Sequence, residues 1–520
     1  MHLKALLIGL VLLNSPLTFA AWREASSEHF VIYADDSERD LRTFSEKMER
    51  YHQAMVTVFP SHLDAPSPSN RLVVYVLGNE NQVRKLQRGD SGVGRLLGFY
   101  VPRAGNSAAF MPAIHNKATG EVSESERVLM QEYAHHIRRQ NLNTRTPTWF
   151  NTGFAEYFAS ASFYRNGDVI LGSPNNYRAE DFTRADVRQI DIEELLDSAT
   201  HASHQSNTRA DNFAVRSWSL FHYLYSNQDG KAKMADYLNR LNRGETELDS
   251  ARAAFGDLSA LNRELTRYLA RSIQAWRIPN GRLSVAPIAI KELNSAEAAS
   301  LAVRMQFASG IRASETERIA DVLREARELA TQYPDEPDVQ AVLAEAEYTA
   351  GNDDATITAA DKALAFNPNH MNALIQKGYA LTRIATNTKD PAAWAKMRSH
   401  FLAINKIEPD NPIALLYYYG SFVGQGELPT QNAISGLEWA LQLAPYDASL
   451  RLTAARAQIN QKRYQEAIQT LSVPAFSAND NTKDAALALL ETAQQALAAQ
   501  SASAAEVEGV AAPTSAAAQP

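Results

Sequence analysis

Between residues 25 and 113, the spacing of hydrophobic positions switches repeatedly between two periods. Four short apolar runs, bounded by polar residues and turn formers, predict strands at 29–35, 71–77, 95–101 and 107–113. Between the first two runs, apolar side chains recur every three or four residues, at Leu41, Phe44, Met48, Tyr51 and Met55. That spacing predicts an amphipathic helix over 38–59. Strands and helices therefore alternate in this part of the chain, which predicts an α+β domain.

Two further helices are predicted after these strands. The segment 123–140 opens with Ser123, and Glu126 stands three residues later, which is the pattern of a capping box. The next helix is predicted to begin at Pro147, because proline is favoured in the first helical turn. From 188 to 277 the pattern remains mostly helical.

The chain changes character near 284–294, which is predicted to be a linker, and is almost all helical beyond it. Prolines close successive helical runs at spacings of 34, 41 and 36 residues, at Pro334, Pro368, Pro409 and Pro445. The stretch "GNDDATITAADKALAFNP" (351–368) resembles the second half of a tetratricopeptide repeat, with small residues at Ala360 and Ala363. Such units bury their apolar faces only against neighbours, so an array over 295–497 is expected. A generic helical bundle is the alternative.

The two ends of the chain differ in composition from the rest. Residues 1–20 combine basic Lys4, an apolar run to Leu13 and small residues before Ala20, as in a cleavable signal peptide. We therefore expect a periplasmic or secreted protein without a membrane span in the mature chain; a retained N-terminal anchor is the alternative. The Ala-, Ser- and Pro-rich stretch 498–520 predicts a disordered tail.

Length and composition narrow the classes of function. A chain of 520 residues is longer than one ordinary domain. Its net charge of −8 gives no reason to expect nucleic-acid binding or attraction to an anionic membrane. Cysteine is absent from the sequence, which excludes a cysteine nucleophile, a disulfide, Cys-ligated zinc and an iron–sulfur cluster.

The predicted helix over 123–140 contains the candidate chemistry, in the stretch "QEYAHH" (131–136). Positions 131 and 135 lie one turn apart on one face of a helix. In H-E-x-x-H zinc peptidases, histidines at these two positions bind the metal, and the glutamate between them acts as general base on a zinc-bound water. This chain has Gln131, Glu132 and His135, so the first histidine is missing.

Together with "TGFAEYF" (152–158) on the next helix, this motif resembles the gluzincin metallopeptidases, whose third zinc ligand is a glutamate at the position of Thr152. The order of strands, with 107–113 as the edge strand of a cleft, resembles the same family. The whole layout is similar to exported bacterial proteins that join such a domain to tetratricopeptide-like repeats. The resemblance implies a zincin-like α+β domain with a mixed sheet over 21–283, followed by an all-α superhelix.

In this comparison, two of the three metal ligands are replaced by the neutral side chains of Gln131 and Thr152. His135 alone matches a ligand position, and Glu132 matches the general base. Each ligand of a zinc site contributes on the order of 3–4 kcal/mol, so losing two weakens binding by roughly four to six powers of ten. Amide and hydroxyl groups replace imidazole and carboxylate poorly on Zn²⁺. We therefore expect no cofactor and no catalysis, with Glu132 and His135 retained as a buried hydrogen-bonded pair.

The resulting hypothesis is an exported pseudo-metallopeptidase that binds proteins or peptides. Partners would add a strand at 107–113 or lie along the concave face of the repeats. The alternative is a zinc peptidase with a non-standard ligand set. Glu156, one turn beyond Thr152, is a candidate substitute ligand, and a rotated set of Glu132, His136 and Glu156 is a second route.

Overall fold

A six-stranded mixed sheet forms the centre of the first domain. The computed structural model describes residues 21–59, 65–87, 97–115, 122–142, 144–174, 190–203, 207–269, 273–475 and 482–510. The strands are, in sheet order, β4 (Phe99–Val101), β5 (Ala108–Met111), β3 (Leu72–Val76), β2 (Phe30–Ala34), β1 (Arg23–Ser26) and β9 (Ala289–Glu292). β2, β3 and β5 are parallel, whereas β1, β4 and β9 pair antiparallel with their neighbours. The predicted mixed sheet is confirmed.

The strand at the edge of this sheet is not the one expected. β5 pairs with β3 on one side and with β4 on the other, so the prediction that 107–113 forms the edge is wrong. The chain turns back after β4 at Arg103–Gly105, which places β4 along the outer side of β5. Apolar spacing predicts that a strand exists but not which strand is outermost, because both runs are mostly apolar.

Both faces of the sheet are covered by helices. The apolar side chains predicted for helix α1 (Glu38–Val58) are buried in one core with residues of α3 (Glu124–Asn141) and of the strands. On the opposite face, α12 (Ser295–Ala308) packs through Leu301 and Met305, and α2 (Glu80–Gln87) packs through Val83. The central strands β2, β3 and β5 are parallel and lie between these helices, which explains why they are nearly continuous apolar runs.

The helices of the motif form as predicted, and a mostly helical region follows them. Ser123 and Glu126 make both hydrogen bonds of a capping box at the start of α3. Helix α4 (Thr148–Ala159) begins directly after Pro147. A small sheet contains β6 (Ser162–Phe163), β7 (Val169–Leu171) and β8 (Trp276–Ile278). The other elements are η1 (Pro68–Asn70), α6 (Ile192–Leu196), α7 (Ser198–Ser203), α8 (Asn207–Tyr225), α9 (Gln228–Asn242), α10 (Glu247–Phe255), α11 (Leu258–Leu269) and η4 (Asn280–Arg282).

From α12 onward the chain folds as successive helix pairs, which confirms the repeat prediction. The further helices are α13 (Thr316–Gln332), α14 (Pro337–Thr349), α15 (Asp353–Phe366), α16 (Met371–Thr388), α17 (Pro391–Ile407), α18 (Pro412–Gln425), α19 (Gln431–Leu443), α20 (Ala448–Asn460), α21 (Tyr464–Ala475) and α22 (Lys483–Val510). The four prolines at spacings of 34, 41 and 36 residues follow α13, α15, α17 and α19. Gly378 lets α16 approach α17, because a Cβ there would lie 2.5 Å from Cζ of Phe401.

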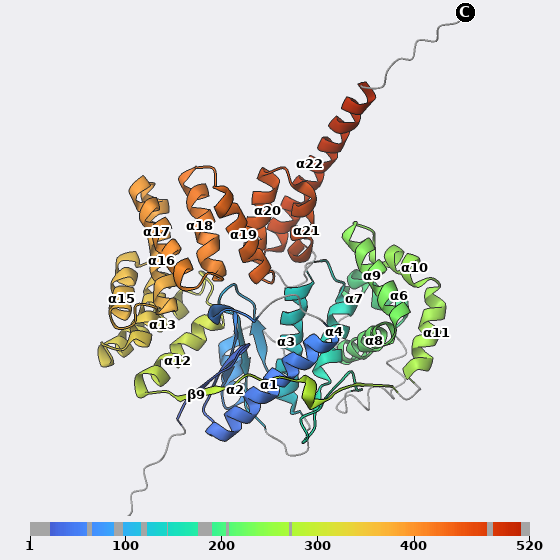
Figure 1. Cartoon of the computed structure of the whole chain (residues 1–520), viewed down its shortest axis with the longest axis horizontal. Helices are drawn as coiled ribbons and strands as arrows, with labels where there is room; N and C mark the ends of the chain where they lie inside the picture. The colour runs from blue at the N-terminus through green and yellow to red at the C-terminus, as the bar shows by residue number, and fades with distance from the viewer. Residues whose placement is uncertain are drawn as a thin grey trace, which may run out of the picture.

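The last helix corrects the prediction for the C-terminus. The composition predicts disorder from 498, but α22 continues to Val510 and extends beyond the body of the molecule (Figure 1). Ala486 and Leu490 bury its first half against α20 and α21. The Ala-rich sequence beyond them has high helix propensity and extends a helix that tertiary packing has already nucleated. Residues 511–520 lie outside the described part of the chain.

The repeats arch over the sheet of the first domain (Figure 1). The Glu408 carboxylate, between α17 and α18, accepts hydrogen bonds from the backbone N–H and the hydroxyl of Ser69, at 2.8 and 2.6 Å. Arg103 donates to the Phe307 carbonyl at the end of α12, at 3.0 Å. The segment predicted as a linker contributes β9 to the sheet. Part of the repeat surface predicted to bind peptides is therefore covered by the protein's own first domain.

Residues 1–20, where the signal peptide is predicted, lie outside the described residues. Among the helices that the structure does describe, none combines the length and apolar character that a membrane crossing requires.

Candidate functional site

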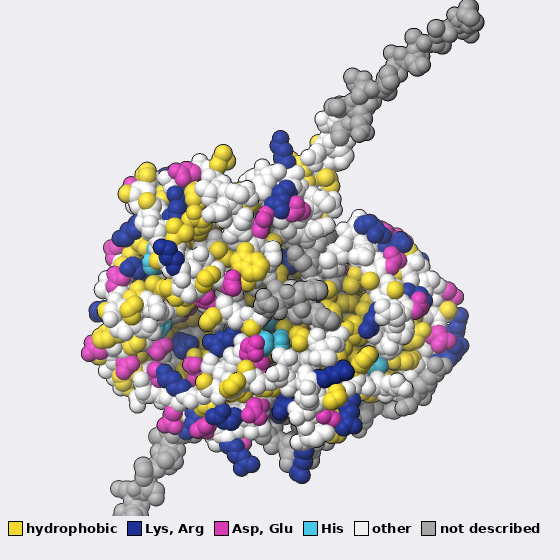
Figure 2. Space-filling model, in the orientation of Figure 1, with side chains coloured by type: hydrophobic (Ala, Val, Ile, Leu, Met, Phe, Trp, Pro, Cys, Tyr) yellow, Lys and Arg dark blue, Asp and Glu magenta, His cyan; other side chains and the backbone are white. Residues whose placement is uncertain are grey.

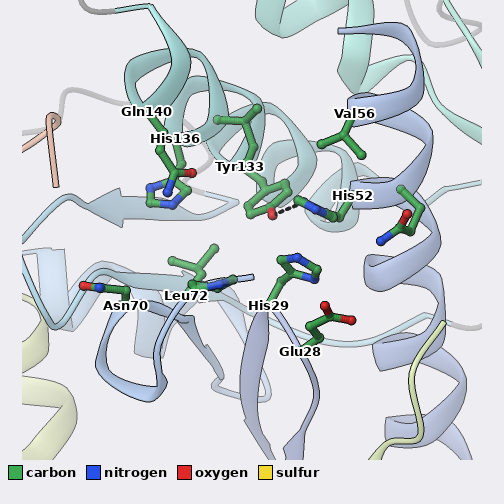
Figure 3. A pocket seen from close by; sticks show the side chains of 12 residues that line it. Glu28, His29, His52, Val56, Asn70, Leu72, Tyr133, His136 and Gln140 are labelled. Carbon is green, nitrogen blue, oxygen red and sulfur yellow. Dashed lines mark hydrogen bonds between the residues drawn. The ribbon is translucent and has the colours of Figure 1, made fainter. Parts of the chain in front are cut away.

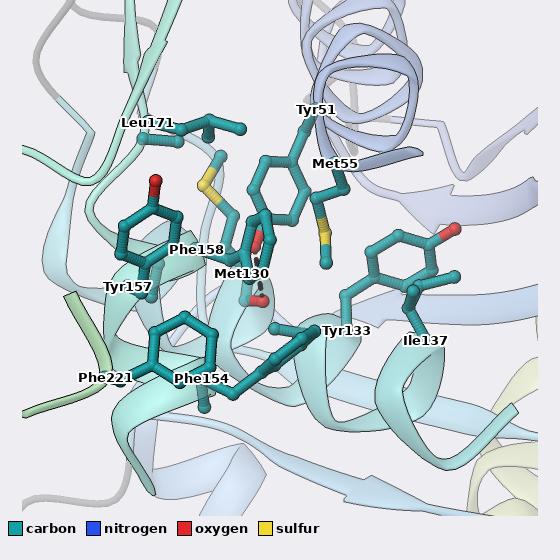
Figure 4. Packing of buried hydrophobic residues seen from close by; sticks show 14 of the residues in the cluster. Tyr51, Met55, Met130, Tyr133, Ile137, Phe154, Tyr157, Phe158, Leu171 and Phe221 are labelled. Atoms are coloured by element: carbon teal, nitrogen blue, oxygen red, sulfur yellow. Dashed lines mark hydrogen bonds between the residues drawn. The ribbon is translucent and has the colours of Figure 1, made fainter. Parts of the chain in front are cut away.

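Helix α3 has an apolar side and a half-buried polar side. Its apolar side packs against α1 and α4 in the core of the first domain (Figure 4), through Met130, Tyr133, Ala134 and Ile137. Gln131, Glu132 and His135 are all only partly buried. The amphipathic pattern of α3 therefore determines which side of the helix faces the core. The motif residues lie at the border between this side and the exposed side.

Helix α4 packs beside α3 and contains the second half of the motif. Thr152 is half-buried, whereas Glu156 is buried and already interacts with other groups of the protein. Gly153 allows α4 to lie directly against α8, because a Cβ at this position would be 2.4 Å from the Ser217 carbonyl oxygen. The glycine of "TGFAEYF" is therefore explained by close helix packing.

The two retained residues of the motif are both electrostatically perturbed. Burial raises the pKa of the Glu132 carboxyl to about 7, although the nearby Arg139 guanidinium opposes this shift. Burial lowers the pKa of His135 to about 3, and the charges of Arg138 and Arg139 lower it further. At neutral pH the imidazole of His135 is therefore neutral, and the Glu132 carboxyl is close to half protonated.

The residues at the motif fit a catalytic metal poorly. Within the described residues, no group of three or more His, Asp or Glu side chains is placed to hold a metal ion. Gln131 and Thr152 offer only neutral oxygen atoms where the resemblance calls for imidazole and carboxylate. At the matching and substitute positions of the motif, the remaining donors are His135, Glu132 and the buried Glu156.

Two of the expected arrangements do not form. His136 Nδ1 lies 2.6 Å from the Tyr100 hydroxyl on β4, and Glu132, His136 and Glu156 do not form a metal-binding group in the described part of the chain. Among the described residues no hydrogen bond joins Glu132 to His135, so the expected buried pair is absent.

One of the two edge strands of the sheet, β4, lies against the motif helix. In the described part of the chain, β4 pairs only with β5. Gly98, just before β4, lies over α3: a Cβ on this glycine would be 3.2 Å from Cγ1 of Val128. Val128 precedes Gln131 and Glu132 by about one turn, so one face of β4 lies against α3 near the motif.

A second candidate site, which the sequence did not indicate, is a cavity of about 220 Å³ beside α1, α3 and the start of β2 (Figure 3). His29, His52 and His136 all line it, together with Tyr133. These residues come from three separate elements and form no local motif. The three- and four-residue spacing of apolar residues in α1 predicted a buried face. It did not predict that the ring of His52 would contact the ring of His29.

The imidazoles of this cavity are held by hydrogen bonds at one ring nitrogen each. His29 Nδ1 lies 2.7 Å from the buried Glu49 carboxylate, and His52 Nδ1 lies 2.7 Å from the Tyr133 hydroxyl. The rings of His29 and His52 stack with centroids 3.6 Å apart. Burial lowers the pKa of both His52 and His136 to about 3, so these two rings are neutral at physiological pH.

Comparisons with known proteins were made for the whole chain. No model of a protein family matches the sequence, and no curated protein matches it either. Among solved structures, the chain is similar to TTC0263, a tetratricopeptide repeat protein of Thermus thermophilus, with 16% identity and a TM-score of 0.32, covering 39% of this chain and 99% of that one.

Two further structures show the same kind of partial similarity. One is residues 41 to the end of MamA from Desulfovibrio magneticus RS-1, with 17% identity and a TM-score of 0.25, covering 34% of this chain and 92% of that chain. The other is the TPR2AB domain of yeast Sti1 in complex with pHSP90, with 13% identity and a TM-score of 0.18, covering 51% and 98% of the two chains. Similarity at this level transfers no function to this chain.

Proposed function

We propose that this chain is an exported, non-hydrolytic peptide-binding protein that resembles a metallopeptidase but lacks its metal. The observation that supports this proposal best is that β4, whose outer edge is unpaired among the described residues, lies against α3 close to Gln131, Glu132 and His135. An exposed strand edge offers a row of unpaired N–H and C=O groups to an extended peptide. The predicted signal peptide over 1–20 supports export to the periplasm or beyond.

The ligand that we propose is an apolar, extended peptide. Figure 2 shows hydrophobic side chains gathered in the hollow between the C-terminal repeats and the lobe formed by α6–α11. Backbone pairing with β4 would supply affinity, and contacts of alternate side chains of the peptide would supply specificity. The repeats act in this proposal chiefly as a rigid support, because they hold the turn after β4 through Arg103 and Ala104.

Hydrolysis is not part of the proposal because the ligand set is incomplete. Gln131 and Thr152 leave His135 as the one histidine at a ligand position of the motif. Without a firmly held cation, no bound water reaches a pKa near 7 and no carbonyl oxygen is polarised.

The second candidate function is a zinc peptidase with a non-standard ligand set. One observation favours it: Glu132 stands at the general-base position, and burial raises its pKa to about 7. A general base works best when its pKa is near the working pH. Glu156 would have to act as a ligand in this case.

A binding and cleavage experiment on the full chain separates the two candidates. A library of extended apolar peptides is incubated with the purified protein, and both bound and cleaved peptides are identified by mass spectrometry. The proposal predicts intact bound peptides and slower amide hydrogen exchange at residues 98–101, with no change in the distant α13. Cleavage that Glu132→Gln abolishes would favour the peptidase. Binding without protection at 98–101 would exclude β4 as the binding edge.

A further inference from the structure

Three arginine side chains gather where α3 approaches the C-terminal repeats. Figure 1 shows α3 below the end of the repeats that α19, α20 and α21 form. The ring of His136 on α3 contacts the ring of Tyr446, just before α20, with centroids 4.7 Å apart. Arg138 and Arg139 follow His136 in the last turn of α3, and Arg451 follows Tyr446 in α20. This contact therefore brings together guanidinium groups from the first domain and from the repeats.

Two of these arginines are buried and have only neutral partners. Arg138 is 6% exposed and donates to the Thr146 hydroxyl at 2.9 Å, and its Nε has no hydrogen-bond partner. Arg451 is 1% exposed and donates to two backbone carbonyls, those of Pro445 and, at 3.1 Å, Thr470. Within the described ranges, neither arginine forms an ion pair with a carboxylate. Burying a positive charge without a counter-charge costs free energy.

Arg139 is the partly exposed member of this cluster. In the part of the chain that the structure describes, it makes no hydrogen bond and no ion pair. Burial lowers the pKa of the Arg138 and Arg451 guanidinium groups to about 9, and the charge of Arg139 contributes to the shift of both. Charges influence one another in this way only over short distances, and all three groups are positive at neutral pH.

The negative charges near the cluster do not balance it. Arg139 acts on the Glu132 carboxyl, which is close to half protonated at neutral pH because its pKa is about 7. The backbone dipole of α3 adds roughly half of a negative charge at the C-terminal end of the helix. These two sources compensate about one positive charge, so an excess of about two positive charges remains at the junction.

We propose that this junction binds a phosphate group through the Arg139 guanidinium, while the buried charges of Arg138 and Arg451 strengthen the attraction. A phosphate group carries about 1.5 to 2 negative charges at neutral pH, which matches the excess, whereas a carboxylate carries a single charge. The planar guanidinium donates two parallel N–H groups to phosphate oxygens. The phosphate is either the free anion or part of a larger molecule. This site does not depend on peptide binding at β4.

Isothermal titration calorimetry on the full chain tests the site with inorganic phosphate and with acetate. Both titrations are made at pH 7, with sodium chloride holding the ionic strength constant, because general screening would otherwise imitate weak binding. We expect saturable binding of one phosphate per chain and an affinity for acetate that is lower by about tenfold or more. Phosphate that does not saturate, or equal affinity for both anions, would overturn the proposal.

Phenyl phosphate distinguishes the two sources of the phosphate group. An affinity equal to that of inorganic phosphate indicates a site open to phosphate groups of larger molecules. Exclusion of phenyl phosphate, with inorganic phosphate still bound, indicates the free anion.

Variants of Arg139 test which side chain holds the anion. Arg139→Gln should weaken phosphate binding by about tenfold or more, because it removes the charged donor. Arg456→Gln, at an exposed position of α20, is the matched control and should leave the affinity unchanged. Arg139→Lys keeps the charge but loses the paired N–H groups, so its affinity should lie between those of the wild type and Arg139→Gln. Equal affinity of the wild type and Arg139→Gln would contradict the proposed site.

Thermal unfolding measures the excess of positive charge independently of binding. Without phosphate, Arg139→Gln should unfold at a higher temperature than the wild type, because one of three like charges is removed. Phosphate should raise the unfolding temperature of the wild type but not that of Arg139→Gln. A lower unfolding temperature of Arg139→Gln without phosphate would show that this charge is already balanced within the protein, and the proposal would fail.

Discussion

The backbone N–H of Ala104, in the turn between β4 and β5, donates a hydrogen bond of 2.9 Å to the Asp447 carboxylate. The other oxygen of the same carboxylate caps α20 by accepting the Leu450 N–H, also at 2.9 Å. Ala104 itself is buried among apolar residues of α18, α19 and α20. The repeats therefore hold the turn that follows the edge strand, and the position of β4 depends on them.

This relationship predicts the effect of removing the Asp447 carboxylate. Asp447→Ala loses a helix cap and a charge-assisted hydrogen bond across the domain junction, so we expect a loss of about 2–4 kcal/mol in the free energy of unfolding. Urea unfolding measures it, with the exposed Asp354→Ala as the control, expected to change stability by less than about 0.5 kcal/mol. Equal stability of both variants would mean that the junction does not depend on this contact.

Acid stability should depend on three histidines of the first domain. Burial lowers the pKa of His52, His135 and His136 to about 3, from 6.5 in the unfolded chain. Below pH 6.5 the unfolded chain binds protons that the folded chain does not, so stability is full above that pH and falls as the pH decreases. Each histidine lowers the free energy of unfolding by up to about 1.4 kcal/mol for each pH unit below 6.5.

Urea unfolding between pH 7 and pH 5 checks this prediction. The wild-type free energy of unfolding should fall steeply as the pH decreases over this range. His52→Gln should reduce the slope of this free energy against pH by an amount that corresponds to about one proton. His115→Gln, at an exposed position, is the matched control and should leave the slope as it is. A slope that His52→Gln does not alter would show that this ring is protonated in the folded protein.

The contribution of Glu132 to the free energy of unfolding should have the opposite pH dependence. Burial raises its pKa from 4.5 to about 7, so ionising this carboxyl costs free energy in the folded chain but not in the unfolded chain. Stability is thus lost as the pH rises from 4.5 to 7. We expect Glu132→Gln to be more stable than the wild type at pH 8 by about 2–3 kcal/mol and by much less at pH 5. A gain that does not change with pH would contradict the raised pKa.

Restoring the two missing ligands should restore metal binding. The double variant Gln131→His with Thr152→Glu regains an imidazole and a carboxylate, so its zinc affinity should rise by roughly four to six powers of ten. Zinc content after dialysis measures the gain, and each single variant is a control expected to show only part of it. If the double variant stays free of zinc, α3 and α4 are not arranged as in a metallopeptidase.

Local signals in the sequence predicted the elements that carry the candidate site. The capping box of Ser123 and Glu126 and the helix start at Pro147 depend on neighbouring residues alone, and both form. The spacing of Leu41 to Met55 likewise predicted the buried side of α1. These features are short-range, so the pattern of residue types is sufficient to predict them.

Features that depend on long-range packing were not predictable from the sequence. Which of two apolar runs becomes the sheet edge depends on how the chain turns at Ala104, and that turn is held by Asp447, more than 300 residues away. The cavity joins His29, His52 and His136 from three elements, and Asn70 is oriented there by the carbonyl of Asp410. The members of these pairs are far apart in the sequence, so no short segment contains both of them.

The metal content of the purified, mature wild-type protein, dialysed without chelator, is the most direct test of the central claim that Gln131 and Thr152 leave too few strong ligands for a catalytic cation. We predict far less than one zinc per chain by elemental analysis, with no change in His135→Ala. One tightly held metal ion per chain that is lost in His135→Ala would contradict the claim and favour the peptidase.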